Sequence, residues 1–163
     1  MEKKYQWKKG FFSAKCILFS DNAEAGNFND KSFSQTATAV LNGVEYRFRT
    51  RGFFKQHTTI SDASGTTCLG EITYNSWMNK AHIKLQEESF EWKYENFWGT
   101  RWQIAGKDTL IQYTGSSSKG SVNSNHNSDL LILCGLAAMN YYRQISVAII
   151  VAVFVPLWVS LSH

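Results

Sequence analysis

The most constraining feature of this 163-residue chain is the near absence of charge at its C-terminal end. After Asp129 the only Lys, Arg, Asp or Glu is Arg143, so the last 34 residues hold one of the thirty charged side chains. A helix that is apolar on every face is stable only where protein encloses it or lipid surrounds it. The rest of the chain must therefore supply an enclosure, or this end must enter a membrane, or both.

Arg143 divides the apolar end into two segments. The first follows Asp129, the expected N-cap, and predicts a helix over about residues 129–143. At about 20 Å this helix is shorter than the ~30 Å hydrocarbon core of a bilayer, so we expect protein to enclose it. The expected core residues of this helix are Leu130, Leu131, Leu133, Leu136 and Met139.

The second segment, residues 145–161, has 17 residues without a charge, which is the lower limit for a membrane span. Trp158 near its far end, and Tyr141 and Tyr142 before its start, suit the aromatic belts of a bilayer. We therefore expect a transmembrane helix. The alternative is a final buried strand, because seven of its first eleven residues are Val or Ile.

From about residue 10 to residue 123, apolar residues alternate with polar ones, and turn residues recur about every ten positions. This pattern is typical of an antiparallel barrel or sandwich. Asn42-Gly43 is the preferred pair for a two-residue type I′ hairpin turn. Ten or eleven short strands predict a mainly β fold, a closed antiparallel barrel, because bare sheet edges invite aggregation. The expected strands are 13–20, 35–41, 44–50, 56–61, 67–73, 80–85, 89–95, 100–105, 108–113 and 120–123.

Composition favours an intracellular soluble part with a basic surface. Residues 1–128 hold 16 Lys and Arg against 12 Asp and Glu, and the whole chain has a formal net charge of +4. The three cysteines cannot all pair, and the N-terminus lacks the apolar run of a cleaved signal peptide. These features are typical of a reducing compartment.

Several aromatic stretches, followed by the helix from Leu130, carry a resemblance to a known family. The stretches are Phe53-Phe54-Lys55 through Ile72, Ser76-Trp77, Phe90 through Trp98, and Thr100 through Ile104. Over about residues 10–144 the chain resembles the tubby C-terminal-like superfamily, which includes tubby domains, phospholipid scramblases and LURP-one-related proteins. It is also similar to uncharacterised bacterial proteins of this superfamily that have an Asn-Tyr-Tyr-Arg-Gln junction followed by a hydrophobic C-terminal segment.

The resemblance implies a closed barrel of about a dozen strands around a buried hydrophobic helix. Residues 1–144 would form this domain and residues 145–161 a transmembrane tail. Because tubby domains bind phosphoinositides through basic residues, the resemblance also implies phospholipid as a binding partner.

The candidate headgroup-binding residues are Arg47, Arg49, Arg51 and Lys55. The three arginines alternate along one strand and so project from one face, where guanidinium groups bind phosphate oxygens bidentately. Phe53 and Phe54 would enter the headgroup layer beside them. The alternative is an ordinary solvated barrel exterior.

Other motifs do not indicate a reaction. Asp21 through Asn27 lacks the ligands of a calcium loop and reads as a polar hairpin loop. No His lies at metal-ligand spacing from a Cys, and no GxSxG or HExxH motif is present. We expect no metal and no cofactor.

The aromatic residues around Trp77, Trp92, Trp98 and Trp102 are interleaved with Glu, which opposes nucleic acid. Core and rim packing is therefore the expected role of these rings. We expect no nucleic-acid partner, and the sequence indicates no particular protein partner.

The sequence thus predicts a non-enzymatic, single-pass membrane protein that binds phospholipid or acts as a membrane-proximal scaffold. Arg143 before the span places the barrel on the cytoplasmic side by the positive-inside rule. One alternative is a soluble cytoplasmic, partner-binding barrel whose tail is an internal strand. A less favoured alternative is a small hydrolase with an unrecognised site.

Overall fold

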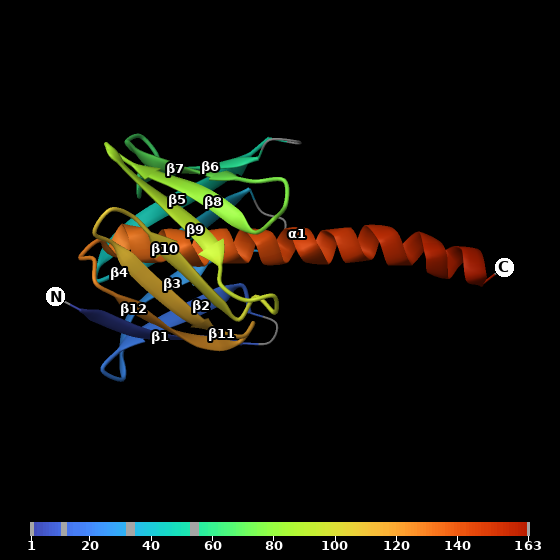
Figure 1. Cartoon of the computed structure of the whole chain (residues 1–163), viewed down its shortest axis with the longest axis horizontal. Helices are drawn as coiled ribbons and strands as arrows, with labels where there is room; N and C mark the ends of the chain where they lie inside the picture. The colour runs from blue at the N-terminus through green and yellow to red at the C-terminus, as the bar shows by residue number, and fades with distance from the viewer. Residues whose placement is uncertain (1, 11–12, 32–34, 53–55, 163) are drawn as a thin grey trace.

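A computed structural model describes residues 2–10, 13–31, 35–52 and 56–162. Twelve antiparallel strands form a closed barrel, and one helix runs through it and emerges at one end (Figure 1). β1 pairs with β12, which closes the sheet and confirms the predicted closed antiparallel β-barrel. The strands are β1 Lys3–Lys9, β2 Lys15–Ser20, β3 Ala23–Asn29, β4 Thr36–Leu41, β5 Val44–Arg51, β6 His57–Asp62, β7 Cys68–Tyr74, β8 Lys80–Leu85, β9 Glu88–Tyr94, β10 Arg101–Ala105, β11 Leu110–Gly115 and β12 Lys119–Ser124.

Alternation of apolar and polar residues determines which side of each strand faces inward. In β9, Phe90 and Trp92 are buried while Glu91 between them is exposed. The β4–β5 hairpin turns at Asn42 and Gly43, whose φ angles are +51° and +82°. Positive φ at both positions is the mark of a type I′ turn, as predicted.

Two strands, β1 and β3, were not expected from the sequence. In β1, Tyr5 and Trp7 alternate into the core between lysines. The interpretation of Asp21 through Asn27 as a hairpin loop is wrong, because β3 begins at Ala23 and only the preceding pair makes the turn. β3 lies against β4 through Gly26, where a Cβ would lie 2.0 Å from the Val40 carbonyl oxygen.

The helix α1 (Asp129–Leu161) is continuous over 33 residues, about 50 Å. The predicted end at residue 143 is therefore wrong, and so is the alternative of a final internal strand. Arg143 and Gln144 are good helix formers, so nothing at the junction breaks the helix. The N-cap is Ser128, whose Oγ accepts a hydrogen bond from Leu131 N at 3.1 Å; Asp129, the predicted cap, lies in the first turn instead.

The first three turns of α1 lie in the barrel core. Of the five predicted core residues, Leu130 is half-buried and the other four are at most 6% exposed. The barrel wall bonds directly to the helix backbone: Tyr113 Oη donates to the Ile132 carbonyl (2.9 Å) and Trp92 Nε1 to the Gly135 carbonyl (3.1 Å). Such bonds fix the depth and rotation of the helix.

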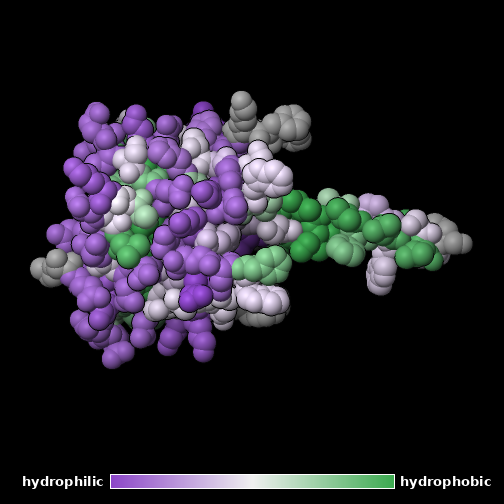
Figure 2. All heavy atoms as spheres, in the orientation of Figure 1, coloured by the Kyte–Doolittle hydropathy of each residue, from purple (hydrophilic) through white to green (hydrophobic). Residues whose placement is uncertain are grey.

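Beyond Ser146 nearly every residue of α1 is exposed, and this part of the helix is apolar (Figure 2). By length and composition, α1 is the one helix of the described residues that is able to cross a membrane. The predicted enclosed helix and the predicted hydrophobic C-terminal segment are thus consecutive parts of one helix, α1.

Candidate functional site at the helix exit

The closed antiparallel topology gives the barrel two distinct ends. At the entry end, where α1 begins, Asp129 accepts hydrogen bonds from Lys3 Nζ (2.7 Å) and Asn42 Nδ2 (2.9 Å). We call the opposite end, where odd-numbered strands finish and even-numbered strands start, the exit end. α1 leaves the barrel through the exit end (Figure 1).

Polar contacts hold α1 in the mouth of the exit end. Asn140 and Gln144 both donate to Asp30 Oδ2, the latter at 3.1 Å. Arg143 donates to the Ser116 carbonyl at 3.0 Å and lies 5.6 Å from the centre of the Trp102 ring. Burial raises the pKa of the Asp30 carboxyl, and the two amide donors oppose this shift.

Charges of opposite sign collect at the two ends. Counting each described charged residue in a loop, in the last two residues of a strand at that end, or on α1 in its mouth, the exit end has ten cationic and two acidic side chains. The entry end has four cationic and nine acidic side chains. The exit-end cations are Lys8, Lys9, Lys15, Lys31, Arg51, Lys80, Lys93, Arg101, Lys119 and Arg143, and the acids there are Asp30 and Glu95.

The separation of charge is not visible along any single strand, because each strand contributes only one or two of these side chains to an end. The signal was available in the sequence. Five of the six strands that run away from the exit end have a Lys, Arg or His as their first residue, and β4 is the exception. This pattern can be read only once the direction of each strand is known.

Arg47, Arg49 and Arg51 all project from the outer face of β5, as predicted, and all are exposed. They do not form one cluster at the exit end. The Arg47 guanidinium lies 3.6 Å from the position that a Cβ of Gly65 would take, in the β6–β7 turn at the entry end. Arg51 alone reaches the exit end, while Lys55, Phe53 and Phe54 lie outside the described residues.

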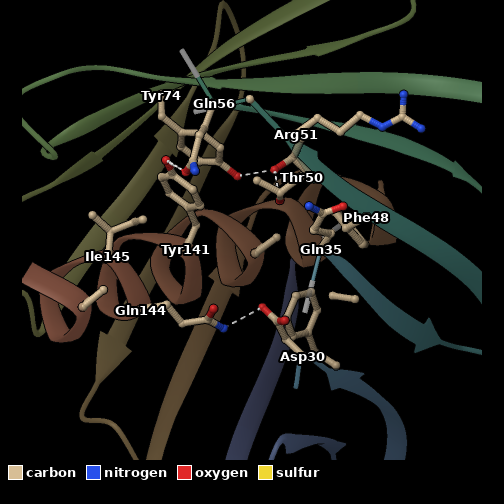
Figure 3. Close-up of a pocket in the computed structure, with 16 residues that line it drawn as sticks. Asp30, Gln35, Phe48, Thr50, Arg51, Gln56, Tyr74, Tyr141, Gln144 and Ile145 are labelled. Atoms are coloured by element: carbon tan, nitrogen blue, oxygen red, sulfur yellow. Dashed lines mark hydrogen bonds between the residues drawn. The ribbon is translucent and has the colours of Figure 1, made fainter. Parts of the chain in front are cut away.

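Two cavities flank α1 where it leaves the barrel. The first has a volume of about 230 Å³. In it Tyr141 and Gln144 on α1 face Gln56 and Asp30 on loops of the exit end, and Arg51 points away (Figure 3). Tyr141 stacks on Tyr74 at 3.7 Å between ring centres.

The second cavity has a volume of about 250 Å³, and its lining includes Trp7, Cys16 and Met139 together with Lys9 and Arg143. The Trp7 indole N–H has no hydrogen-bond acceptor among the described residues. A cavity lined by both apolar residues and two cations suits an anionic amphiphile.

The aromatic residues expected to pack in the core and rim divide into two groups. Phe90, Trp92 and Trp102 are buried in the core. Trp77, Phe97 and Trp98 are 86%, 95% and 82% exposed, so for these three the prediction of packing is wrong. All three lie in loops of the exit end, β7–β8 and β9–β10.

The remaining reactive groups do not gather into a site. Within the described ranges, no three His, Cys, Asp or Glu side chains lie close enough together to hold a metal ion. Cys134 lies buried in α1 and Cys16 in the wall, where burial raises the pKa of the Cys16 thiol to about 11. Cys68 is exposed at the entry end.

Comparison of the chain with protein-family models, with curated proteins and with solved structures gives no match. We therefore infer the function from the geometry of the exit end.

Proposed function

We propose that this protein is a non-enzymatic, single-pass membrane protein of the tubby and scramblase-like type. In this proposal, residues 145–161 cross the bilayer and the barrel lies on the cytoplasmic side. The barrel binds anionic phospholipid at the membrane surface and serves as a membrane-proximal scaffold. The single observation that carries the proposal is the continuity of α1, whose first part is core and whose last part is bare and apolar.

The exposed part of α1 has the dimensions of a short span. Seventeen helical residues from Ile145 extend about 26 Å, and bilayers adjust to a mismatch of a few ångströms by local thinning. Exposure of the Phe154 and Trp158 side chains to water is unfavourable, and their transfer into lipid is favourable. Pro156 is tolerated there because transmembrane helices accommodate proline.

The charges of the exit end support the cytoplasmic side. Positive residues flank the cytoplasmic end of a span far more often than the other end. Each Lys or Arg near an anionic leaflet contributes about 1 kcal/mol to membrane attraction. Ten exit-end cations against two acids therefore favour a barrel seated on the cytoplasmic leaflet, with its acidic entry end directed away.

The second cavity supports phospholipid as the ligand. Lys9 and Arg143 line this cavity together with Trp7 and Met139, so a lipid phosphate would find cationic partners and the start of an acyl chain would find apolar ones in the same space. The barrel-like enclosure of an apolar helix is also what the tubby-like resemblance implies.

Membrane fractionation of the full chain, beside a chain truncated after Gln144, tests the anchor. The full chain is expected to stay in the membrane fraction after alkaline extraction, and the truncated chain to be released. A full chain that partitions into the aqueous phase without detergent would overturn the proposal.

Vesicle flotation of the truncated chain then tests lipid binding. Lys15→Glu/Lys119→Glu is the charge-reversal variant of the exit end, and Lys84→Glu/Lys107→Glu at the entry end is its control. We expect the exit-end variant to float less with anionic vesicles, and the entry-end control to float like the unsubstituted chain. Equal flotation of the exit-end variant and the unsubstituted chain would overturn the binding of anionic lipid by the exit end.

A further inference from the structure

The β7–β8 loop is closed by hydrogen bonds to the side chain of its first asparagine, and it leaves a tryptophan exposed to water. The side-chain oxygen of Asn75 accepts hydrogen bonds from the backbone N–H groups of Asn79 (3.2 Å) and Lys80 (3.1 Å). Met78 has φ +58°, a conformation that residues other than glycine rarely adopt. Trp77, two residues after the asparagine, is 86% exposed.

The β9–β10 loop repeats this plan. The side-chain oxygen of Asn96 accepts from the backbone N–H groups of Thr100 (3.0 Å) and Arg101 (3.1 Å). Gly99, at the position equivalent to Met78, has φ +66°. Trp98, again two residues after the asparagine, is 82% exposed. Both loops follow the pattern Asn-x-Trp-x-x-cation, with the cation starting the next strand.

Local stability does not explain these tryptophans, because neither indole is buried by its own loop. A large exposed aromatic group on a fixed loop is typical of an interaction surface. Tryptophan in particular gathers at the bilayer interface, where its ring meets the acyl chains and its N–H the headgroups. The five hairpin loops of the entry end contain no Phe, Tyr or Trp.

The first loop is tied directly to α1 at the point where the helix leaves the barrel. Tyr142, the last buried residue of α1, accepts a hydrogen bond from Asn75 N (3.1 Å) and donates to the Lys80 carbonyl. The apolar segment begins at Ile145, about 4.5 Å further along the axis. No linker separates the barrel from the apolar segment, so in the proposed membrane anchor the exit-end loops would lie at the level of the headgroups.

We infer that the two Asn-x-Trp loops dock into the headgroup layer of the anionic bilayer that α1 spans. Trp77 and Trp98 enter the interface, and Lys80 and Arg101 contact lipid phosphates. Lys80 also lies 3.6 Å from Glu91, an exposed pair that competes only weakly. This docking rests on the proposed membrane anchor, and it fixes the barrel upright on the membrane as a second, separate attachment.

A single-probe experiment on the full chain tests the docking. Cys68→Ser removes the exposed native thiol, and Ser76→Cys places an environment-sensitive fluorophore beside Trp77. The labelled chain is incorporated into vesicles of phosphatidylcholine with added phosphatidylglycerol. We expect spin-labelled lipid to quench the Ser76→Cys probe and aqueous iodide to leave it unquenched. A probe on native Cys68, at the entry end, should be quenched by iodide and not by the lipid.

Trp77→Ser/Trp98→Ser is expected to restore iodide quenching of the Ser76→Cys probe. Val44→Ser/Leu110→Ser, which removes exposed apolar side chains at the entry end, is the matched control and should leave the probe protected. If the chain co-floats with the vesicles but iodide quenches the Ser76→Cys probe as strongly as a probe on Cys68, the docking alone is overturned. The exposed loops would then be a surface for a protein partner. A chain that does not co-float would overturn the anchor and the docking together.

Discussion

The Tyr113 ring occupies the space that a side chain at Gly135 would need. A Cβ built on Gly135 would lie 2.1 Å from the Tyr113 hydroxyl oxygen, far inside contact distance. The barrel wall therefore approaches α1 here as closely as a helix backbone allows, and the hydroxyl uses this closeness to reach the Ile132 carbonyl.

Gly135→Ala is expected to lower the free energy of unfolding by about 2–3 kcal/mol, the cost of overpacking a rigid core. In a helix without this contact the same change would stabilise by about 0.5–1 kcal/mol. Chemical denaturation in detergent micelles, followed by tryptophan fluorescence, measures the difference. Tyr113→Leu should reduce the penalty in the double variant, and a stabilised Gly135→Ala would contradict the packing.

Much of the barrel is predictable from the sequence because alternation and turn chemistry are local. Asn42-Gly43 determined its turn through two adjacent residues. β3 was missed because Ala23–Asn29 contains no β-branched residue, and its pairing depends on the contact between Gly26 and Val40 across the sheet.

The candidate site was less predictable, because it depends on which loops share an end of the barrel. Trp77 and Trp98 are ordinary core candidates by sequence, and only the strand directions place them beside the helix exit. The continuity of α1 is not evident from the sequence, because a lone charge such as Arg143 in an apolar stretch suggests a boundary, whereas the Arg143 side chain contacts Ser116 and Trp102 without interrupting the helix.

Ser128→Ala is expected to lower the free energy of unfolding by about 1 kcal/mol, since it removes the acceptor for Leu131 N. Ser128→Asp keeps a capping oxygen and should retain most of the stability. Denaturation of the three proteins under one set of conditions measures the effect. A Ser128→Ala variant as stable as the unsubstituted chain would return the capping role to Asp129.

Thiol labelling should detect one reactive cysteine in the folded chain. Cys68 is exposed, whereas Cys16 and Cys134 are buried. Burial raises the pKa of the Cys16 thiol to about 11, and Cys134 is enclosed in the core. At pH 8 only about one in a thousand Cys16 thiols would be ionised. A maleimide should therefore label one cysteine in the folded, unsubstituted chain and none in the folded Cys68→Ser chain. In denaturant it should label all three cysteines of the unsubstituted chain. Rapid native labelling of the Cys68→Ser chain would contradict the described core.

Asp30 should make the stability of the helix exit depend on pH. Burial raises the pKa of Asp30 in the folded state above its unfolded value of about 4. The folded state thus holds the proton more tightly, and the associated stability is present below pH 4 and lost as pH rises through the raised pKa. Asp30→Asn keeps a side-chain oxygen that accepts hydrogen bonds from Asn140 and Gln144. Because the asparagine amide does not ionise, this variant does not lose stability as the pH rises.

The unfolding midpoint of Asp30→Asn, relative to the unsubstituted chain, should therefore rise between pH 4 and pH 7. Asp62→Asn is a control with the opposite sign and a lower pH window. Hydrogen bonds from Ser64 lower the pKa of the Asp62 carboxyl, so the relative midpoint of Asp62→Asn should fall as pH rises toward about 4 and stay level from about pH 4 to pH 7. A relative midpoint for Asp30→Asn that falls with pH would contradict the burial of Asp30.

The most direct test of α1 as one helix that begins in the barrel and ends in the bilayer is thiol accessibility in sealed vesicles. Val153→Cys and Ser64→Cys, each with Cys68→Ser, place one thiol on the exposed apolar part of α1 and one in the β6–β7 turn. A membrane-impermeant maleimide should label Ser64→Cys at once and Val153→Cys only after detergent dissolves the bilayer, while Cys16 and Cys134 stay buried in the folded barrel. Equal labelling rates at the two positions in intact vesicles would contradict a membrane-spanning α1.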